Sequence, residues 1–140
     1  MARRFLSGCS LLAAMLGCAS AGGGPAPKLE DTTWQLVDVA GDRIPEGARP
    51  SSLTLQSVEH KVVGFAGCNR LIGDYRADGR SLRFTPLGST KMACREPAMS
   101  LEKRFLDALG RAKTYALSGG MLELRDEDTI LARLRAAAAP

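Results

Sequence analysis

The four cysteines have the widest range of possible chemistry of any residues in this chain. Cys9 and Cys18 lie near the amino terminus, Cys68 lies in Gly67-Cys68-Asn69-Arg70, and Cys94 ends the segment 89–94. A cysteine can carry a lipid, pair with another cysteine in a disulfide, react as a thiolate or bind a metal ion. The segments around each cysteine indicate which chemistry applies.

The first residues are typical of an export signal. Arg3 and Arg4 precede residues 5–16, which are mostly apolar and too few to span a bilayer. This stretch ends in Met15-Leu16-Gly17-Cys18, which resembles the lipobox of bacterial lipoproteins. The resemblance implies a lipoprotein signal peptide at residues 1–17, removed before an acylated Cys18 that anchors the protein in a membrane. An ordinary secretory signal, cut after Ala19 or Ala21, is the alternative. Cys9 is removed in either case.

Residues 18–28 are small and rich in glycine and proline, which is typical of a flexible tether. No Asp follows Cys18, and in enterobacterial lipoproteins such an Asp retains the protein in the inner membrane. By that resemblance we expect an outer-membrane lipoprotein facing the periplasm. We expect one folded domain at residues 29–135, a size usual for a single domain, and a frayed tail at 136–140.

The charge of the chain argues against a nucleic-acid partner. The sequence has 19 Lys and Arg against 15 Asp and Glu, but loss of Arg3 and Arg4 with the signal leaves 17 against 15. The remaining cations are scattered, whereas a nucleic-acid surface needs a clustered basic stripe. No pattern in the sequence indicates a cofactor.

Alternating apolar residues predict a strand-rich domain. Trp34, Leu36 and Val39 are expected on a buried face, and Asp78-Gly79 predicts a hairpin turn. We expect strands at 33–39, 52–57, 62–65, 71–75, 82–84, 114–118, 121–125 and 129–134, with a further short strand at 87–92.

Residues 100–112 have the period of an amphipathic helix, with Ser100 as its N-cap. Leu101, Phe105, Leu106 and Leu109 form its apolar face, opposite Glu102, Lys103, Asp107 and Arg111. The expected fold class is α+β: a single domain of curved antiparallel β-sheet with one main amphipathic helix packed on it.

Several segments together resemble the META domain (HslJ-like) family of bacterial envelope proteins. They are 34–36, 67–70, 73–75, 82–84, 87–94, 99–106 and 122–124, in the family's order, with Lys91 where Arg is more usual. The resemblance covers nearly the whole domain. It implies a compact antiparallel fold with helical packing, an envelope location and no established enzymatic activity. It also implies a link, in some members, to stress and antibiotic tolerance.

Cys68 and Cys94 are the cysteines that remain once Cys9 is removed and Cys18 is acylated. The exported compartment is oxidising, so we predict a disulfide between them. A redox-active pair is one alternative, although it more often has a Cys-x-x-Cys spacing. A metal site is another, but zinc needs four ligands and His60 is the only histidine.

No catalytic constellation is present in the sequence. His60 lies in a polar stretch, and no Gly-x-Ser-x-Gly motif presents a nucleophile, so we expect no enzyme. The predicted disulfide would gather a candidate binding rim for an acidic partner or a lipid headgroup, formed by Asn69, Arg70, Thr90, Lys91 and Arg95.

Two functions remain open. The first is a non-enzymatic envelope lipoprotein that binds an unknown envelope protein or acts in envelope stress and antibiotic tolerance. The alternative is a module that binds a small apolar ligand or lipid in a cavity between sheet and helix.

Overall fold

The structure is a computed structural model that describes residues 25–138. The predicted signal peptide and the lipid attachment at Cys18 lie outside the described residues. The elements are β1 (Thr33–Val39), β2 (Asp42–Arg43), β3 (Ser52–Gln56), β4 (Lys61–Phe65), β5 (Arg70–Asp78), β6 (Ser81–Ser89), α1 (Ala98–Arg111), β7 (Thr114–Ser118), β8 (Met121–Asp126) and β9 (Thr129–Ala136). The α+β prediction is confirmed.

The strands form one antiparallel sheet that closes on itself. Their order is β2-β1-β3-β4-β5-β6-β7-β8-β9, and β1 also pairs with β9. The closure joins the two ends of the domain, because Leu36 lies opposite Leu134. Between β6 and β7 only Ser81 and Thr114 are paired, so the barrel is open along most of that seam.

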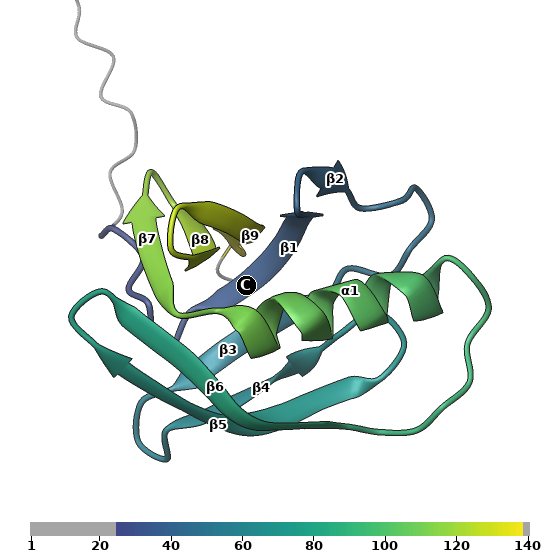
Figure 1. Cartoon of the computed structure of the whole chain (residues 1–140), viewed down its shortest axis with the longest axis horizontal. Helices are drawn as coiled ribbons and strands as arrows, with labels where there is room; N and C mark the ends of the chain where they lie inside the picture. Colours follow the sequence, from purple (N-terminus) through teal and green to yellow (C-terminus); the bar gives the residue numbers. More distant parts are fainter. Residues whose placement is uncertain (1–24, 139–140) are drawn as a thin grey trace, which may run out of the picture.

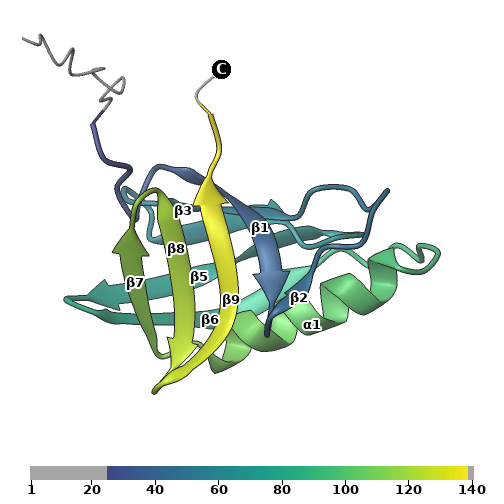
Figure 2. The ribbon, with the colours of Figure 1, turned by 90° about the horizontal axis from the view of Figure 1, so that it is seen from above.

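Helix α1 fills this opening. It contacts β6, β8, β9 and β1, and Figure 1 shows it between the β3–β6 half of the barrel and the half formed by β7–β9 and β1. Leu101, Phe105 and Leu109 recur at helical spacing and are fully buried against the sheet. The view from above in Figure 2 shows α1 extending from the lower ends of the upright strands β7, β8 and β9 past β1 and β2.

The helix starts earlier than the sequence predicts. It begins at Ala98 after Pro97, so Ser100 is not the N-cap. A proline is compatible with a helix start because it has no backbone N–H, and the first helical N–H groups lack intrahelical partners anyway. The backbone N–H of Ser100 donates instead to the carboxylate of Glu96 at 3.1 Å.

The predicted separate strand at 87–92 is wrong, because residues 87–89 continue β6. Pro86 interrupts the ladder without ending the strand, since it lies at a register shift between the pairs Gly73–Leu87 and Tyr75–Phe84. A bulge is where a strand tolerates a residue that cannot donate a ladder hydrogen bond. At the other end of the domain, β9 continues through Ala136, the first residue of the predicted tail. The N–H of Ala137 donates to Thr33 at 2.8 Å.

The barrel interior is packed with apolar side chains. Alternate residues of the strands point inward, and the largest fully buried side chains are Trp34, Leu53, Leu55, Leu71, Tyr75, Leu82, Leu122, Leu124 and Leu134, with Leu101, Phe105 and Leu109 from the helix. The predicted apolar cavity between sheet and helix is therefore not observed in residues 25–138. A surface groove of about 450 Å³ lies beside the helix instead, and half of its lining residues are charged, among them the ion pair Arg104–Asp42.

Residues 29–31 close one end of the barrel. The carbonyl of Leu29 accepts a hydrogen bond from the Trp34 indole at 2.9 Å, and Asp31 accepts two from Ser57 in the β3–β4 turn. These hydrogen bonds from Ser57 lower the pKa of Asp31. The chain therefore enters the domain at the end formed by the β3–β4 and β5–β6 turns.

Ionisation of Tyr75 is expected to lower the stability of the protein at high pH. Its ring is buried and its hydroxyl donates to the Glu30 carboxylate; burial, and then this contact, raise the pKa of Tyr75 well above its ordinary value near 10. The unfolded chain releases this proton at lower pH than the folded protein. The free energy of unfolding is therefore expected to fall as pH rises above about 10. Denaturant unfolding between about pH 9 and 11 should show a steeper fall for the native chain than for Tyr75→Phe. Equal slopes would show that Tyr75 does not cause the loss.

Candidate binding site

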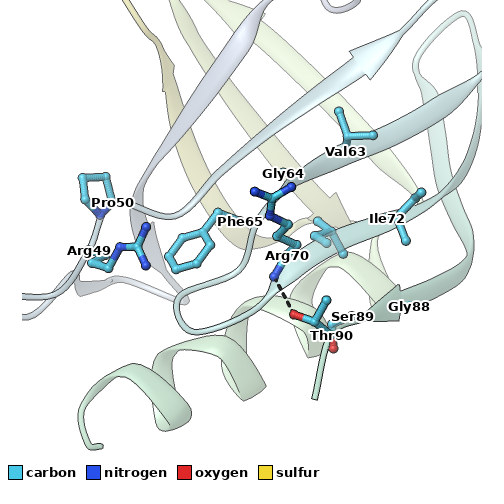
Figure 3. A pocket seen from close by; sticks show the side chains of 11 residues that line it. Arg49, Pro50, Val63, Gly64, Phe65, Arg70, Ile72, Gly88, Ser89 and Thr90 are labelled. Atoms are coloured by element: carbon cyan, nitrogen blue, oxygen red, sulfur yellow. Dashed lines mark hydrogen bonds between the residues drawn. The ribbon is translucent and has the colours of Figure 1, made fainter. Parts of the chain in front are cut away.

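A hollow of about 880 Å³ lies on the outside of the barrel, at the end of β4 and the start of β5. On these strands Val62 and Leu71 point into the core, whereas Val63, Phe65 and Ile72 lie on the outer face. Val63 pairs with Ile72, so the apolar side chains are adjacent in the sheet. Figure 3 shows this surface from close by. We call it the Phe65 hollow.

Ile72 is the large apolar side chain most open to solvent in the hollow, with 59% of its surface exposed. Its neighbour on β6 is Gly88, which adds no side chain above the strand. A Cβ built at Gly88 would lie 3.7 Å from the Ile72 carbonyl oxygen, an ordinary contact, so neither space nor a positive φ requires glycine there. Gly88 thus leaves open a space that a larger residue would occupy.

Two arginines border the apolar surface. The Arg49 guanidinium lies over the Phe65 ring, 4.4 Å from its centroid, in cation–π geometry. Arg70 lies opposite Phe65 in the β4–β5 pair, and Figure 3 shows both side chains beside the ring. No acidic residue lines the hollow, and within residues 25–138 neither arginine forms an ion pair.

The turn between β4 and β5 is bound to the helix by Glu102. This carboxylate is buried and accepts hydrogen bonds from the backbone N–H groups of Cys68, at 3.0 Å, and Asn69, at 2.6 Å. Gly67 allows the close approach, because a Cβ there would lie 3.1 Å from the Ala98 carbonyl and its φ is +134°. The sequence-based placement of Glu102 on the polar helix face is therefore wrong.

Asn69 connects the turn, the helix and the segment after β6. Its side-chain N–H2 group donates to Glu102 at 2.8 Å and to the Met92 carbonyl at 3.2 Å. Its Oδ1 accepts from the Met92 N–H at 2.7 Å and the Thr90 hydroxyl at 2.9 Å. The Thr90 Oγ1 in turn accepts from the Arg70 N–H at 3.1 Å, which fixes one border of the hollow.

A disulfide joins Cys68 and Cys94, with 5.9 Å between their Cα atoms. The predicted pairing is present. The bond connects the β4–β5 turn to the loop before α1, so it acts beside the hydrogen bonds of Asn69 on the same two segments. The cysteines are part of the framework of the hollow and do not line it.

The predicted rim is only partly assembled. Arg70 and Thr90 line the hollow, but Asn69 is buried beneath it with 3% exposure, because its amide is used in the hydrogen bonds described above. Lys91 and Arg95 are exposed on the loop after β6 and do not line the hollow. Sequence reasoning missed Arg49, Phe65 and Ile72. One sequence signal could have indicated them. A strand with one face in the core and one in water alternates apolar and polar residues, whereas Val62 and Val63 are consecutive apolar residues and so place an apolar side chain on each face.

Neither a metal-binding cluster nor a membrane-spanning helix is present in the described part of the chain. Residues 25–138 contain no group of three or more His, Cys, Asp or Glu side chains placed to hold a metal ion. Within the same range, no helix is both long enough and apolar enough to cross a membrane.

Comparison with known proteins identifies similar sequences and folds. The family model described as META domain matches residues 27–138. The NMR structure of a protein from Burkholderia xenovorans is 26% identical in sequence and has a TM-score of 0.66. The match covers 89% of this chain and 100% of that protein's chain. The crystal structure of a DUF4847 family protein from Bacteroides vulgatus is 16% identical in sequence, with a TM-score of 0.55. The match covers 80% of this chain and 96% of that chain, and at this identity it supports the fold only. No curated protein matches.

Proposed function

The chain belongs to the META domain family, which is not a known enzyme family, and on this premise we propose that it is a non-enzymatic envelope lipoprotein that binds a partner protein through the Phe65 hollow. In this proposal Cys18 carries the lipid and anchors the protein in the outer membrane, with the domain in the periplasm. A role in envelope stress and antibiotic tolerance would be a consequence of that binding.

The exposed apolar surface of the hollow is the observation that carries the proposal. Contact with water is unfavourable for apolar side chains, and a group of them on the outside of a folded domain typically marks an interaction site. Ile72, Val63 and the half-buried Phe65 form such a group on the paired strands β4 and β5. The turn beside them is fixed by a disulfide and by the Glu102 hydrogen bonds. A preformed surface loses little conformational entropy on binding.

The position of the hollow favours a partner in the compartment over the anchoring membrane. The chain enters the domain beside Ser57, in the β3–β4 turn. The hollow lies at the opposite ends of β4 and β5, where Phe65 and Arg70 are paired. A domain attached at one end thus presents the hollow at the other.

Site-specific photo-crosslinking of the full chain in the native host tests this proposal. A benzoylphenylalanine at Ile72 is expected to give a light-dependent adduct with one protein. Benzoylphenylalanine at Val58 serves as the control, because Val58 is 93% exposed and lies in the turn beside the chain entry, away from the hollow. It is expected not to give that adduct. Identical adducts at both positions, or no protein adduct at Ile72, would overturn the proposal.

Filling the hollow is expected to remove the interaction. Gly88→Val places a β-branched side chain in a strand, beside Ile72, where the added Cβ makes only ordinary van der Waals contacts. We expect at least a tenfold weaker interaction, which corresponds to about 1.4 kcal/mol, with little change in thermal stability. Gly110→Val, on the exposed side of α1, is the control. An undiminished adduct with Gly88→Val would place the contact outside the hollow.

A further inference from the structure

We propose that the partner presents an acidic residue next to an apolar side chain in an exposed segment, and that Arg49 and Arg70 bind the carboxylate while Phe65 and Ile72 receive the apolar group. This inference rests on the proposed function of the Phe65 hollow as a protein-binding site. It goes further by naming the chemistry that the hollow selects.

The charge of the lining supports an acidic ligand. Two guanidinium groups border the hollow, no carboxylate does, and neither arginine has an ion-pair partner among residues 25–138. An occupant that buries these arginines without a counter-charge leaves their N–H donors without acceptors, which weakens binding. An occupant with a carboxylate supplies both the charge and the acceptors.

The arginines are already placed for this contact. Stacking over Phe65, 4.4 Å from the ring centroid, limits the conformations of Arg49. A guanidinium that stacks through its face keeps its N–H groups at the edge, where they can form paired hydrogen bonds with a carboxylate. Arg70 approaches from the other strand, and its backbone N–H is bound to the Thr90 hydroxyl at 3.1 Å. Figure 3 shows the two arginines around the aromatic ring.

The shape of the site favours a protein segment over a lipid. The barrel interior is filled, so an acyl chain has no apolar interior to enter and would stay partly in water on the outer surface. A partner protein places its own surface over the hollow and excludes water from the apolar contact and from the arginines. Charge-assisted hydrogen bonds gain strength when water is excluded.

Two capped synthetic peptides test the selectivity. The first has a central Phe with Asp on either side, and the second has Asn in place of both Asp residues. Binding is followed by fluorescence anisotropy of the labelled peptides with the mature protein purified in detergent. We expect the acidic peptide to bind on the order of tenfold more tightly, and the difference to shrink as salt is added.

Variants of the two arginines connect this preference to the hollow. Arg49→Gln with Arg70→Gln is expected to remove the preference for the acidic peptide, whereas Lys at both positions should retain part of it. Arg76→Gln is the matched control, because Arg76 is exposed on the same strand as Arg70 but does not line the hollow. It should leave the preference unchanged.

The outcomes separate this inference from the proposed function. Equal binding of both peptides, or an acidic preference that survives the double Gln variant, would overturn the inference and leave the Ile72 crosslink unaffected. Binding to phosphatidylglycerol vesicles that depends on both arginines, without peptide selectivity, would overturn it in favour of a lipid headgroup. Absence of any protein adduct at Ile72 would instead overturn the proposed function.

Discussion

Replacing Glu102 by Ala is expected to lower the free energy of unfolding by about 3–5 kcal/mol. The Glu102 carboxylate accepts hydrogen bonds from the backbone N–H groups of Cys68 and Asn69 and from the Asn69 side chain. An alanine leaves these three donors buried without their acceptor. It also releases the contact between the β4–β5 turn and the start of α1.

Urea unfolding of the native chain, of Glu102→Ala and of three further variants measures this effect. Glu102→Gln keeps one carbonyl oxygen but directs an N–H2 group at the turn, so we expect an intermediate loss of about 1–3 kcal/mol. Lys103→Ala is the control, since Lys103 follows Glu102 on α1 but is exposed. Leu101→Ala should be destabilising for a different reason, because it removes apolar volume from the core. A loss below about 1 kcal/mol for Glu102→Ala would show that water replaces the carboxylate.

The β-strands could be predicted from the sequence because their signal is local. Trp34 and Leu36 alternate with polar neighbours, and all of the main strands appear near their predicted positions. Closure of the barrel could not be predicted this way. The pairing of Leu36 with Leu134 joins the two ends of the domain, and no pattern within either strand indicates its partner.

The candidate site was predicted only where it depends on the cysteine segments. Their pairing brings the turn at 67–70 near the segment 89–94, so Arg70 and Thr90 were found. Glu102 was assigned to solvent because a helical pattern separates polar from apolar residues but cannot identify a buried acceptor for a distant turn. Arg49 was missed for a similar reason, since its contact with Phe65 comes from the path of the loop before β3.

Replacing Cys68 and Cys94 together by Ala is expected to lower the free energy of unfolding by about 3.5 kcal/mol, the chain-entropy value for a bond between residues 26 apart. The bond restricts the unfolded chain, so its loss stabilises the unfolded state. The free energy of unfolding of a small domain is typically only about 5–15 kcal/mol, so the disulfide contributes a large fraction of it. Urea unfolding with and without dithiothreitol measures the change, and mass spectrometry after thiol alkylation confirms the redox state.

The double Ala variant is also expected to bind its partner less well without losing binding altogether. Without the bond, the loop before α1 is no longer covalently joined to the β4–β5 turn. The Asn69 hydrogen bonds to Met92 and Thr90 still hold one border of the hollow. Dithiothreitol should therefore weaken crosslinking from benzoylphenylalanine at position 72 when Cys68 and Cys94 are present. It should leave crosslinking unchanged when both cysteines are replaced by Ala. If reductant alters neither stability nor crosslinking of the native chain while its thiols become alkylated, the bond neither stabilises the domain nor shapes the hollow. Full loss of crosslinking in a variant that still unfolds cooperatively would contradict this expectation and show that the shape of the hollow depends on the disulfide.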